Sequence, residues 1–233
     1  FFWPNDPTRL GFQALIGNDS HPFSMDLDGR NKKDLTADSK EFAYGFNASP
    51  DGKQIAYHKS YQIFIADADG ANAKRIETGQ PFNFAPQWSP DGRWLLVATT
   101  AKGAERGAAG KMPKYVTESG YEEFDEVRAR VGRNPPIPHT LWLVDIAGAK
   151  ASELKFDALP GIGNDPLASL RKAAKQDALK GNRAARIETD GDGNGPAIHW
   201  SDDSRNVAVL VRAVDNKDRW LATVDLAGKT LQP

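Results

Sequence analysis

One short segment has the residue types and the spacing of a calcium-binding loop. Asp190, Asp192 and Asn194 alternate with glycines in the run Asp190–Gly195. This matches the opening of a loop in which the first, third and fifth residues surround Ca²⁺ with side-chain oxygens. The glutamate that completes such a loop at its twelfth position is missing, because Ser201 stands there. A weak calcium site is one expectation for this segment and a glycine-rich turn is the alternative; we expect no other cofactor.

A second feature that could do chemistry is a dense group of carboxylates. Glu122 and Glu123 are adjacent, and three further acids lie close to them: Glu118, Asp125 and Glu126. Such a group can form an anionic pocket for a cationic group, for example the free amino terminus of a peptide, or it can be a solvated helix face. Because the acids of Glu122–Val131 precede its arginines, which suits the helix dipole, this segment is predicted to form a short helix.

The motifs of the common catalytic sites are absent from the sequence. There is no G-x-S-x-G nucleophile elbow, no P-loop and no dinucleotide-binding glycine motif. The four histidines, none of which is spaced like a local zinc motif, are His21, His58, His139 and His199. The chain also has no cysteine, which excludes thiolate metal sites and cysteine catalysis. We therefore expect this chain not to be an enzyme by itself.

Composition narrows the class of protein further. The 233 residues carry 30 basic and 31 acidic side chains, a balance that argues against a nucleic-acid-binding module. No apolar run is long enough for a membrane span. The first residues lack the basic and apolar segments of a signal peptide, so Phe1 is expected to be a mature or trimmed end.

An internal repeat supplies the elements that must position these residues. The motif Ser-Pro-Asp-Gly at residues 49–52 recurs at 89–92, and a degenerate copy, Ser-Asp-Asp-Ser, stands at 201–204. A fainter copy is Trp-Pro-Asn-Asp at 3–6. After each copy comes an apolar run that ends in Asp and a Gly-containing turn, closing at 29, 70, 148 and 228. The recurring aspartates are predicted to be turn residues that bond their own backbone, because a turn that builds a repeat must recur.

Each repeat predicts four antiparallel strands. Short β-branched and aromatic runs follow the Asp-Gly turns, for example Lys53–His58 and Arg93–Ala98. We therefore predict an all-β fold, a β-propeller or partial propeller of about four four-stranded blades with one or two short helical insertions. The single domain, residues 1–233, divides into blades at about 1–36, 44–78, 86–156 and 197–233. An open ring would expose strand edges, so a homo-oligomer is expected if the ring does not close.

Two insertions interrupt the repeat, at about 100–137 within the third blade and at 157–195 before the fourth. The second contains a predicted helix, because Asp165 can cap it, Pro166 fits its first position and Gly181 fits the position after its end. The first contains the acidic cluster described above.

The two halves of the chain resemble two related families. Residues 1–100, with Trp-Ser-Pro-Asp-Gly blade starts and Asp-Ala-Asp-Gly turns, resemble the blades of TolB-type propellers, which have PD40-like repeats. Residues 112–233 resemble the N-terminal propeller of S9 serine peptidases, the prolyl-oligopeptidase group that includes dipeptidyl peptidase IV. The stretches that carry this second resemblance are Tyr115–Val131, His139–Gly148 and His199–Gly228.

The resemblance implies a role in recognition. In the dipeptidyl peptidases a glutamate pair on a propeller insertion holds the free N-terminus of the substrate, and Glu122 with Glu123 is the pair that could correspond here. The family's catalytic α/β-hydrolase domain is absent from this chain, so it becomes an expected partner. We expect a non-catalytic binding or gating module for a peptide or protein, in the periplasm or secreted. Two alternatives stay open: a TolB-like periplasmic scaffold for protein–protein interaction, and a metal-assisted propeller enzyme such as an oligogalacturonate-lyase relative.

Overall fold

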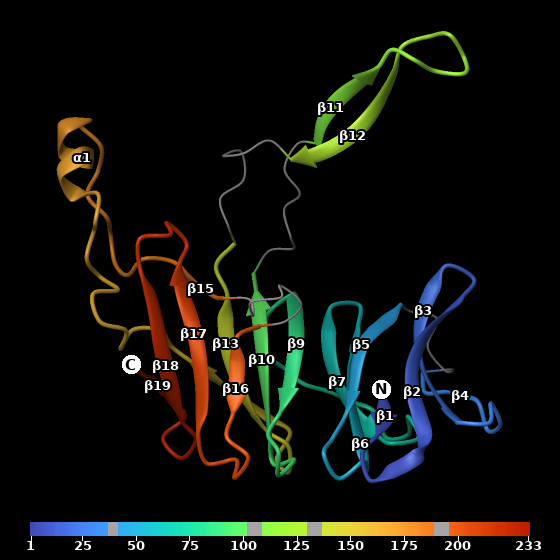
Figure 1. Ribbon diagram of the computed structural model, residues 1–233. Coiled ribbons are helices and arrows are strands. Elements are labelled where there is room, and N and C mark those ends of the chain that lie inside the picture. The colour runs from blue at the N-terminus through green and yellow to red at the C-terminus, as the bar shows by residue number, and fades with distance from the viewer. Residues whose placement is uncertain (37–41, 102–108, 130–136, 189–195) are drawn as a thin grey trace.

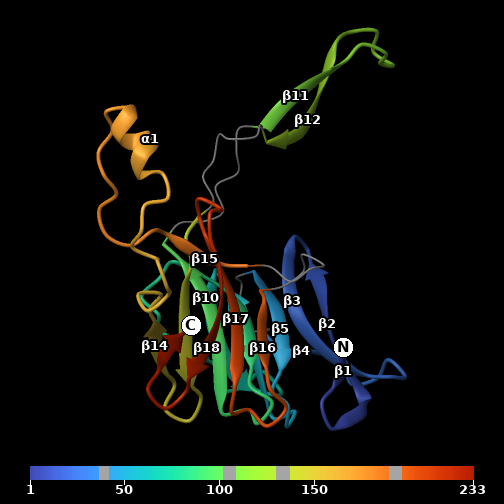
Figure 2. The ribbon, with the colours of Figure 1, turned by 60° about the vertical axis from the view of Figure 1, so that its left-hand side comes forward.

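Four antiparallel sheets stand side by side in chain order in the computed structural model of the protein (Figure 1). The structure describes residues 1–36, 42–101, 109–129, 137–188 and 196–233. The N-terminus lies in the first sheet and the C-terminus in the fourth, at opposite ends of the row (Figure 1). A two-stranded arm and a short helix project from the same side of the row, above the sheets in Figure 1, as Figure 2 also shows. This all-β arrangement confirms the predicted partial propeller of four blades.

The first two sheets each contain four strands that follow one another along the chain. The first sheet consists of β1 (Phe2–Trp3), β2 (Asp6–Ile16), β3 (Asp19–Asp26) and β4 (Lys33–Asp34). The second sheet consists of β5 (Ala43–Ala48), β6 (Gln54–Lys59), β7 (Gln62–Asp67) and β8 (Lys74–Arg75). Every neighbouring pair is antiparallel, as short connections between successive strands require.

The third and fourth sheets contain the insertions. The third sheet consists of β9 (Phe82–Trp88), β10 (Trp94–Thr100), β13 (Thr140–Asp145) and β14 (Lys150–Leu154). Between β10 and β13 lie the two strands of the arm, β11 (Ala109–Lys114) and β12 (Glu123–Ala129). The fourth sheet consists of β15 (Ala185–Ile187), β16 (Ile198–Trp200), β17 (Val207–Ala213), β18 (Arg219–Asp225) and β19 (Thr230–Gln232). Both β15 and β16 pair with β17, so the chain enters this sheet twice.

The prediction of a helix over Glu122–Val131 is wrong, because residues 123–129 form β12. An isolated helix of this length is marginal in water, and its favourable charge order contributes only a few tenths of a kcal/mol. Pairing with β11 instead satisfies the backbone groups of β12 across a hairpin, for example between Met112 and Asp125. Phe124 and Val127 also favour strand over helix.

The predicted helix after Asp165 is present but short. Helix α1 spans Ala168–Ala173 and has no buried residue, so no packing extends it toward Gly181. Asp165 does not cap it and Pro166 is not its first residue, because Leu167 is the N-cap and makes no side-chain cap. The Oδ1 of Asp165 accepts a hydrogen bond from the amide of Leu167 at 2.9 Å. No helix among the described residues is long and apolar enough to cross a membrane.

The hydrophobic core lies between the sheets, in three separate layers. Side chains alternate along each strand, so a central strand supplies both of its faces. In β10, Leu95 and Val97 pack toward the second sheet, whereas Leu96 and Ala98 pack toward the fourth. The layer between the first and second sheets is built around Trp3, whose indole is 3% exposed. The second and third sheets are therefore apolar on both faces.

The repeated turn motif forms the same hydrogen-bond network in three blades. In the second blade, the hydroxyl of Ser49 donates to Asp51 Oδ1 at 2.6 Å, and the same oxygen accepts from the amide of Lys53. The amide of Gln54 in turn donates to Ser49 Oγ. The Ser49 hydroxyl, followed by the Lys53 amide, lowers the pKa of Asp51. The corresponding residues of the third and fourth blades make the same bonds, which confirms that these aspartates are turn residues.

The fourth residue of this motif differs between blades for a reason that the structure shows. Gly52 and Gly92 both have φ +71°, a conformation that favours glycine. In the degenerate copy Ser204 adopts φ +59°, and its Oγ accepts a hydrogen bond from the amide of Asp91 at 2.8 Å. The serine thus joins the third and fourth blades at some cost in backbone strain.

His58 is a deeply buried ionisable group of the second sheet. It is 4% exposed, its ring stacks on Tyr44 at 4.7 Å, and its Nδ1 lies 3.3 Å from the carbonyl oxygen of Tyr44. Among the described residues its Nε2 has no hydrogen-bond partner. Burial lowers the pKa of His58 to about 4, because the charged form is poorly solvated there.

Alanine at Gly52 should destabilise the protein more than alanine at Gly92. Both substitutions introduce a side chain at the same positive φ, which costs about 1 kcal/mol. A Cβ at Gly52 would also overlap the carbonyl oxygen of Pro4 in the first sheet, whereas the nearest atom to a Cβ at Gly92 is 3.8 Å away. Urea unfolding should show a loss of about 1 kcal/mol for Gly92→Ala and about 2–3 kcal/mol for Gly52→Ala. Equal losses would mean that this contact between the first and second blades is unimportant.

The stability of the protein should fall as the pH drops from about 6.5 toward 4. The unfolded chain binds a proton at His58 near its ordinary pKa of 6.5, but the folded chain does so only near 4. Each such histidine therefore removes about 1.4 kcal/mol of unfolding free energy per pH unit in this window. His58→Phe keeps a ring against Tyr44 and should flatten this slope in urea unfolding at several pH values. An unchanged slope would contradict the assignment.

Candidate functional site

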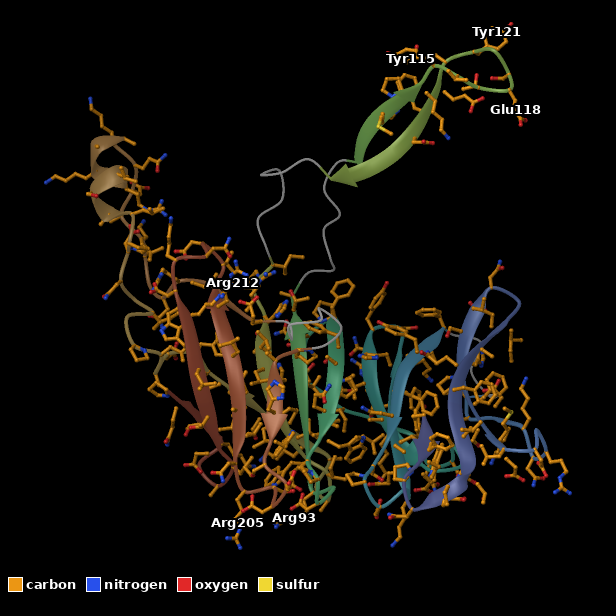
Figure 3. All side chains as sticks on the ribbon, in the orientation of Figure 1. Arg93, Tyr115, Glu118, Tyr121, Arg205 and Arg212 are labelled. Carbon is orange, nitrogen blue, oxygen red and sulfur yellow. The ribbon has the colours of Figure 1, made fainter. Side chains whose placement is uncertain are left out.

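The arm is the feature that stands furthest from the body of the propeller. It leaves the third blade after β10 and returns to it at β13, and its two strands pair only with each other among the described residues. Their register runs from Ala109 opposite Ala129 to Lys114 opposite Glu123. An ion pair between Lys114 Nζ and Asp125 Oδ1, at 3.1 Å, joins the two strands. The arm presents its tip to solvent, as Figure 3 shows.

Large apolar side chains surround the tip of the arm and are exposed. Tyr115 is 77% exposed, Val116 is 97% exposed and Tyr121 is 79% exposed. Phe124, at the start of β12, is more than half exposed. Scattered exposed apolar residues are ordinary, but a group of them on one projecting segment is typical of a surface that contacts a partner.

Hydrogen bonds within the tip close the turn that carries these side chains. The hydroxyl of Thr117 donates to the carbonyl oxygen of Tyr121 at 2.6 Å, and Ser119 Oγ donates to Glu123 Oε1 at 2.8 Å. Gly120, with φ +72°, makes the reversal possible. The turn is thus ordered before any partner binds, which lowers the entropy cost of binding.

The predicted glutamate pair lies at this tip. Glu122 and Glu123 are both exposed, and they stand on the turn and the first position of β12 instead of on a helix. Glu123 already accepts a hydrogen bond from Ser119. Whether the pair binds an amine stays a prediction.

The other predicted site residues either lie outside the described residues or lie in different sheets. The candidate calcium ligands, Asp190, Asp192 and Asn194, lie outside the described residues. His21 Nδ1 pairs with Asp34 Oδ2 at 3.0 Å in the first sheet, whereas His139 Nδ1 accepts from the amide of Ile187. Among the described residues no group of three or more potential metal ligands occurs.

A cleft of about 810 Å³ lies between the third and fourth sheets, at the end opposite the arm. Arg93, Arg205 and Lys229 line it together with several aspartates. The carboxylates of Asp203 and Asp225 accept hydrogen bonds from amides of their own turns. These acids therefore stabilise the turns, and the basic side chains face the solvent; Arg205 is 84% exposed.

Sequence reasoning missed two features. The apolar tip of the arm has a signal in the sequence, since Tyr115, Val116 and Tyr121 flank a polar Glu-Ser-Gly turn. The second is a row of arginines across the fourth sheet, at positions 186, 212 and 219. Arg212 and Arg219 lie opposite each other in one hairpin, which the sequence could have indicated. Arg186 comes from a strand further back in the chain, and its place in the row is visible only in the structure.

Comparison with known sequences finds a relative that matches part of the chain. No protein-family model matches the chain. An uncharacterized protein of Agrobacterium fabrum is 28% identical over 90 residues, which are 35% of this chain and 31% of that protein. The chain therefore spans about a third of the length of this relative.

Two solved structures have a similar arrangement. Dipeptidyl peptidase 4 of Porphyromonas gingivalis superimposes with a TM-score of 0.59 at 16% identity, over 96% of this chain and 30% of that one. A TolB-type protein of Agrobacterium tumefaciens superimposes with a TM-score of 0.50 at 15% identity, over 97% of this chain and 60% of that one. At these identities the likeness concerns the fold alone. It confirms that the chain resembles both a segment of a peptidase propeller and a TolB propeller.

Proposed function

We propose that this chain is a non-catalytic propeller module that recognises a peptide or a protein, and that the tip of the arm makes the contact. The observation that carries this proposal is the ordered tip with Tyr115, Val116 and Tyr121 exposed on it. Aromatic side chains on a rigid support bury a large area at little cost in entropy, and they are enriched where proteins bind one another. The hairpin of β11 and β12 acts as the support.

The carboxylates at the tip suggest the chemistry of the partner. Glu118, Glu122 and Glu123 are exposed around the aromatic residues, so the tip combines an apolar surface with negative charge. A peptide that begins with a free ammonium group and an apolar side chain complements both properties. Each exposed ion pair contributes little by itself, and the aromatic contacts would supply most of the affinity.

The proposal extends to the setting in which the module works. The likeness to a peptidase propeller suits a chain that admits peptides to an α/β-hydrolase domain as its partner. The TolB likeness suits the alternative, a scaffold whose arm binds a folded protein. Both settings favour a periplasmic or secreted location. In the first setting the arm binds a short peptide, and in the second it binds a folded protein. The following experiments distinguish these two partners.

Removing the glutamate charges should weaken binding of peptides that have a free N-terminus. A library of short peptides, tested in free and N-acetylated form against the immobilised chain, should bind about fivefold more weakly after acetylation. Glu122→Gln with Glu123→Gln should abolish this difference, because the ammonium group loses its counter-charge. Glu77→Gln with Glu153→Gln removes two exposed charges from the body of the propeller and serves as the matched control. Equal binding of both peptide forms by the native chain would exclude amine capture.

Removing the aromatic side chains should weaken binding more strongly. We expect Tyr115→Ser with Tyr121→Ser to lower the affinity for bound peptides about tenfold or more, in either peptide form. Both residues are exposed, so the melting temperature should be unchanged. If no short peptide binds the native chain, but a folded protein does and this variant loses it, the scaffold alternative holds. If the variant binds every partner like the native chain, the arm is not the recognition surface.

A further inference from the structure

The fourth sheet carries a row of three arginines on one face. Arg186 of β15 is the register partner of Arg212 in β17, and Arg212 is in turn the partner of Arg219 in β18. The inner side chains of β17 and β18, such as Val211 and Trp220, pack toward the third sheet. The arginines alternate with them and therefore lie on the outer face of the sheet.

The row has more positive charge than its described neighbours neutralise. Glu188 is the single described carboxylate in ion-pair contact with it: its Oε1 lies 3.1 Å from Arg212 Nη1, and its Oε2 lies 3.2 Å from Arg219 Nε. The Nε of Arg186 is buried and has no hydrogen-bond partner among the described residues. Among the described residues, one carboxylate thus serves the three guanidinium groups and contacts two of them.

This excess charge is unfavourable for folding. Like charges on directly opposite residues of neighbouring strands destabilise a sheet, and an unpartnered buried polar atom adds a further cost. The charge of the row also acts on His139. Burial, followed by the charge of Arg186, lowers the pKa of its imidazole to about 4. Residues that reduce stability are typical of functional surfaces, so the row is a candidate binding site.

The surroundings of the row define the chemistry of that ligand. Next to it on the same face, Leu210 is the register partner of Leu221, which is 68% exposed. Guanidinium groups bind carboxylates through paired, charge-assisted hydrogen bonds. Among the described residues Arg212 and Arg219 share Glu188, and no ion pair joins Arg186 to a carboxylate. The surface therefore matches a chain segment with two or more carboxylates beside an apolar side chain.

We propose that the outer face of the fourth sheet binds an acidic peptide segment of a partner protein, through Arg186, Arg212 and Arg219. The charge complementarity and the neighbouring leucine pair carry this proposal. The surface lies on the fourth sheet and not on the arm, and its test leaves the arm intact. It can therefore hold or fail independently of the recognition by the arm.

Fluorescence anisotropy with a labelled peptide of glutamates and leucines tests the proposal directly. The native chain should bind this peptide at least tenfold more tightly than the same peptide with glutamine for glutamate. The affinity should fall as the salt concentration rises, since the pairs are partly exposed. Equal affinity for the two peptides, or no binding of either, would overturn the proposal. If inorganic phosphate displaces the peptide and the chain does not distinguish the two peptides, the row is a simple anion site. That result would also overturn the proposal.

Substitutions separate this binding role from a structural one. Arg219→Gln, at a side chain that is 62% exposed, and Arg186→Gln should each weaken the acidic peptide about fivefold to tenfold. Their melting temperatures should stay the same or rise, because repulsion within the row is relieved. Arg205→Gln removes the same charge from the opposite end of the sheet (Figure 3) and should leave binding unchanged. Equal weakening by Arg205→Gln, or no weakening by the other two, would overturn the proposal.

Discussion

Each sheet of a propeller must bury its apolar faces against the neighbouring sheets. The rest of this structure depends on that constraint. The second and third sheets satisfy it on both sides, as Ile55 and Ala56 show by packing toward different neighbours. Among the described residues, the apolar layers cover the first and fourth sheets on one side only. The outer face of the fourth sheet can therefore combine exposed Leu221 with charged Arg219, a pairing that an inner layer would exclude.

The turns at one end of the blades fix how closely the sheets approach. Trp3 Nε1 donates to the carbonyl oxygen of Gly52 at 2.8 Å, and Asp91 donates its amide to Ser204 at 2.8 Å. Each of these bonds joins the turn of one blade to its neighbour. The apolar layers supply the driving force for stacking, whereas these polar contacts define the alignment of one blade on the next. The far end of each blade is free of the motif, and the arm and α1 project from that end.

Much of this architecture could be predicted because its signals are local. Asp51 and Gly52 specify a turn by themselves, and the run after Trp94 specifies a strand that is apolar on both faces. The arm strand β12 could not be predicted in this way, because its charge order favours a helix and only its pairing with β11 makes it a strand. The arginine row is harder still, since Arg186 meets Arg212 through pairing of distant segments. Sites built across strands need the register, which a single sequence does not contain.

The third blade also has a consequence for how such proteins diversify. Thr99 and Thr140 are register partners, so the chain leaves this blade and re-enters it at adjacent positions of two paired strands. The excursion between them adds no strand to the sheet and takes none away. A recombination event could therefore replace the whole arm with another segment while Leu96 and Leu143 keep their places in the core. The third blade is therefore an insertion site, and the inserted segment can change while the fold of the propeller stays the same.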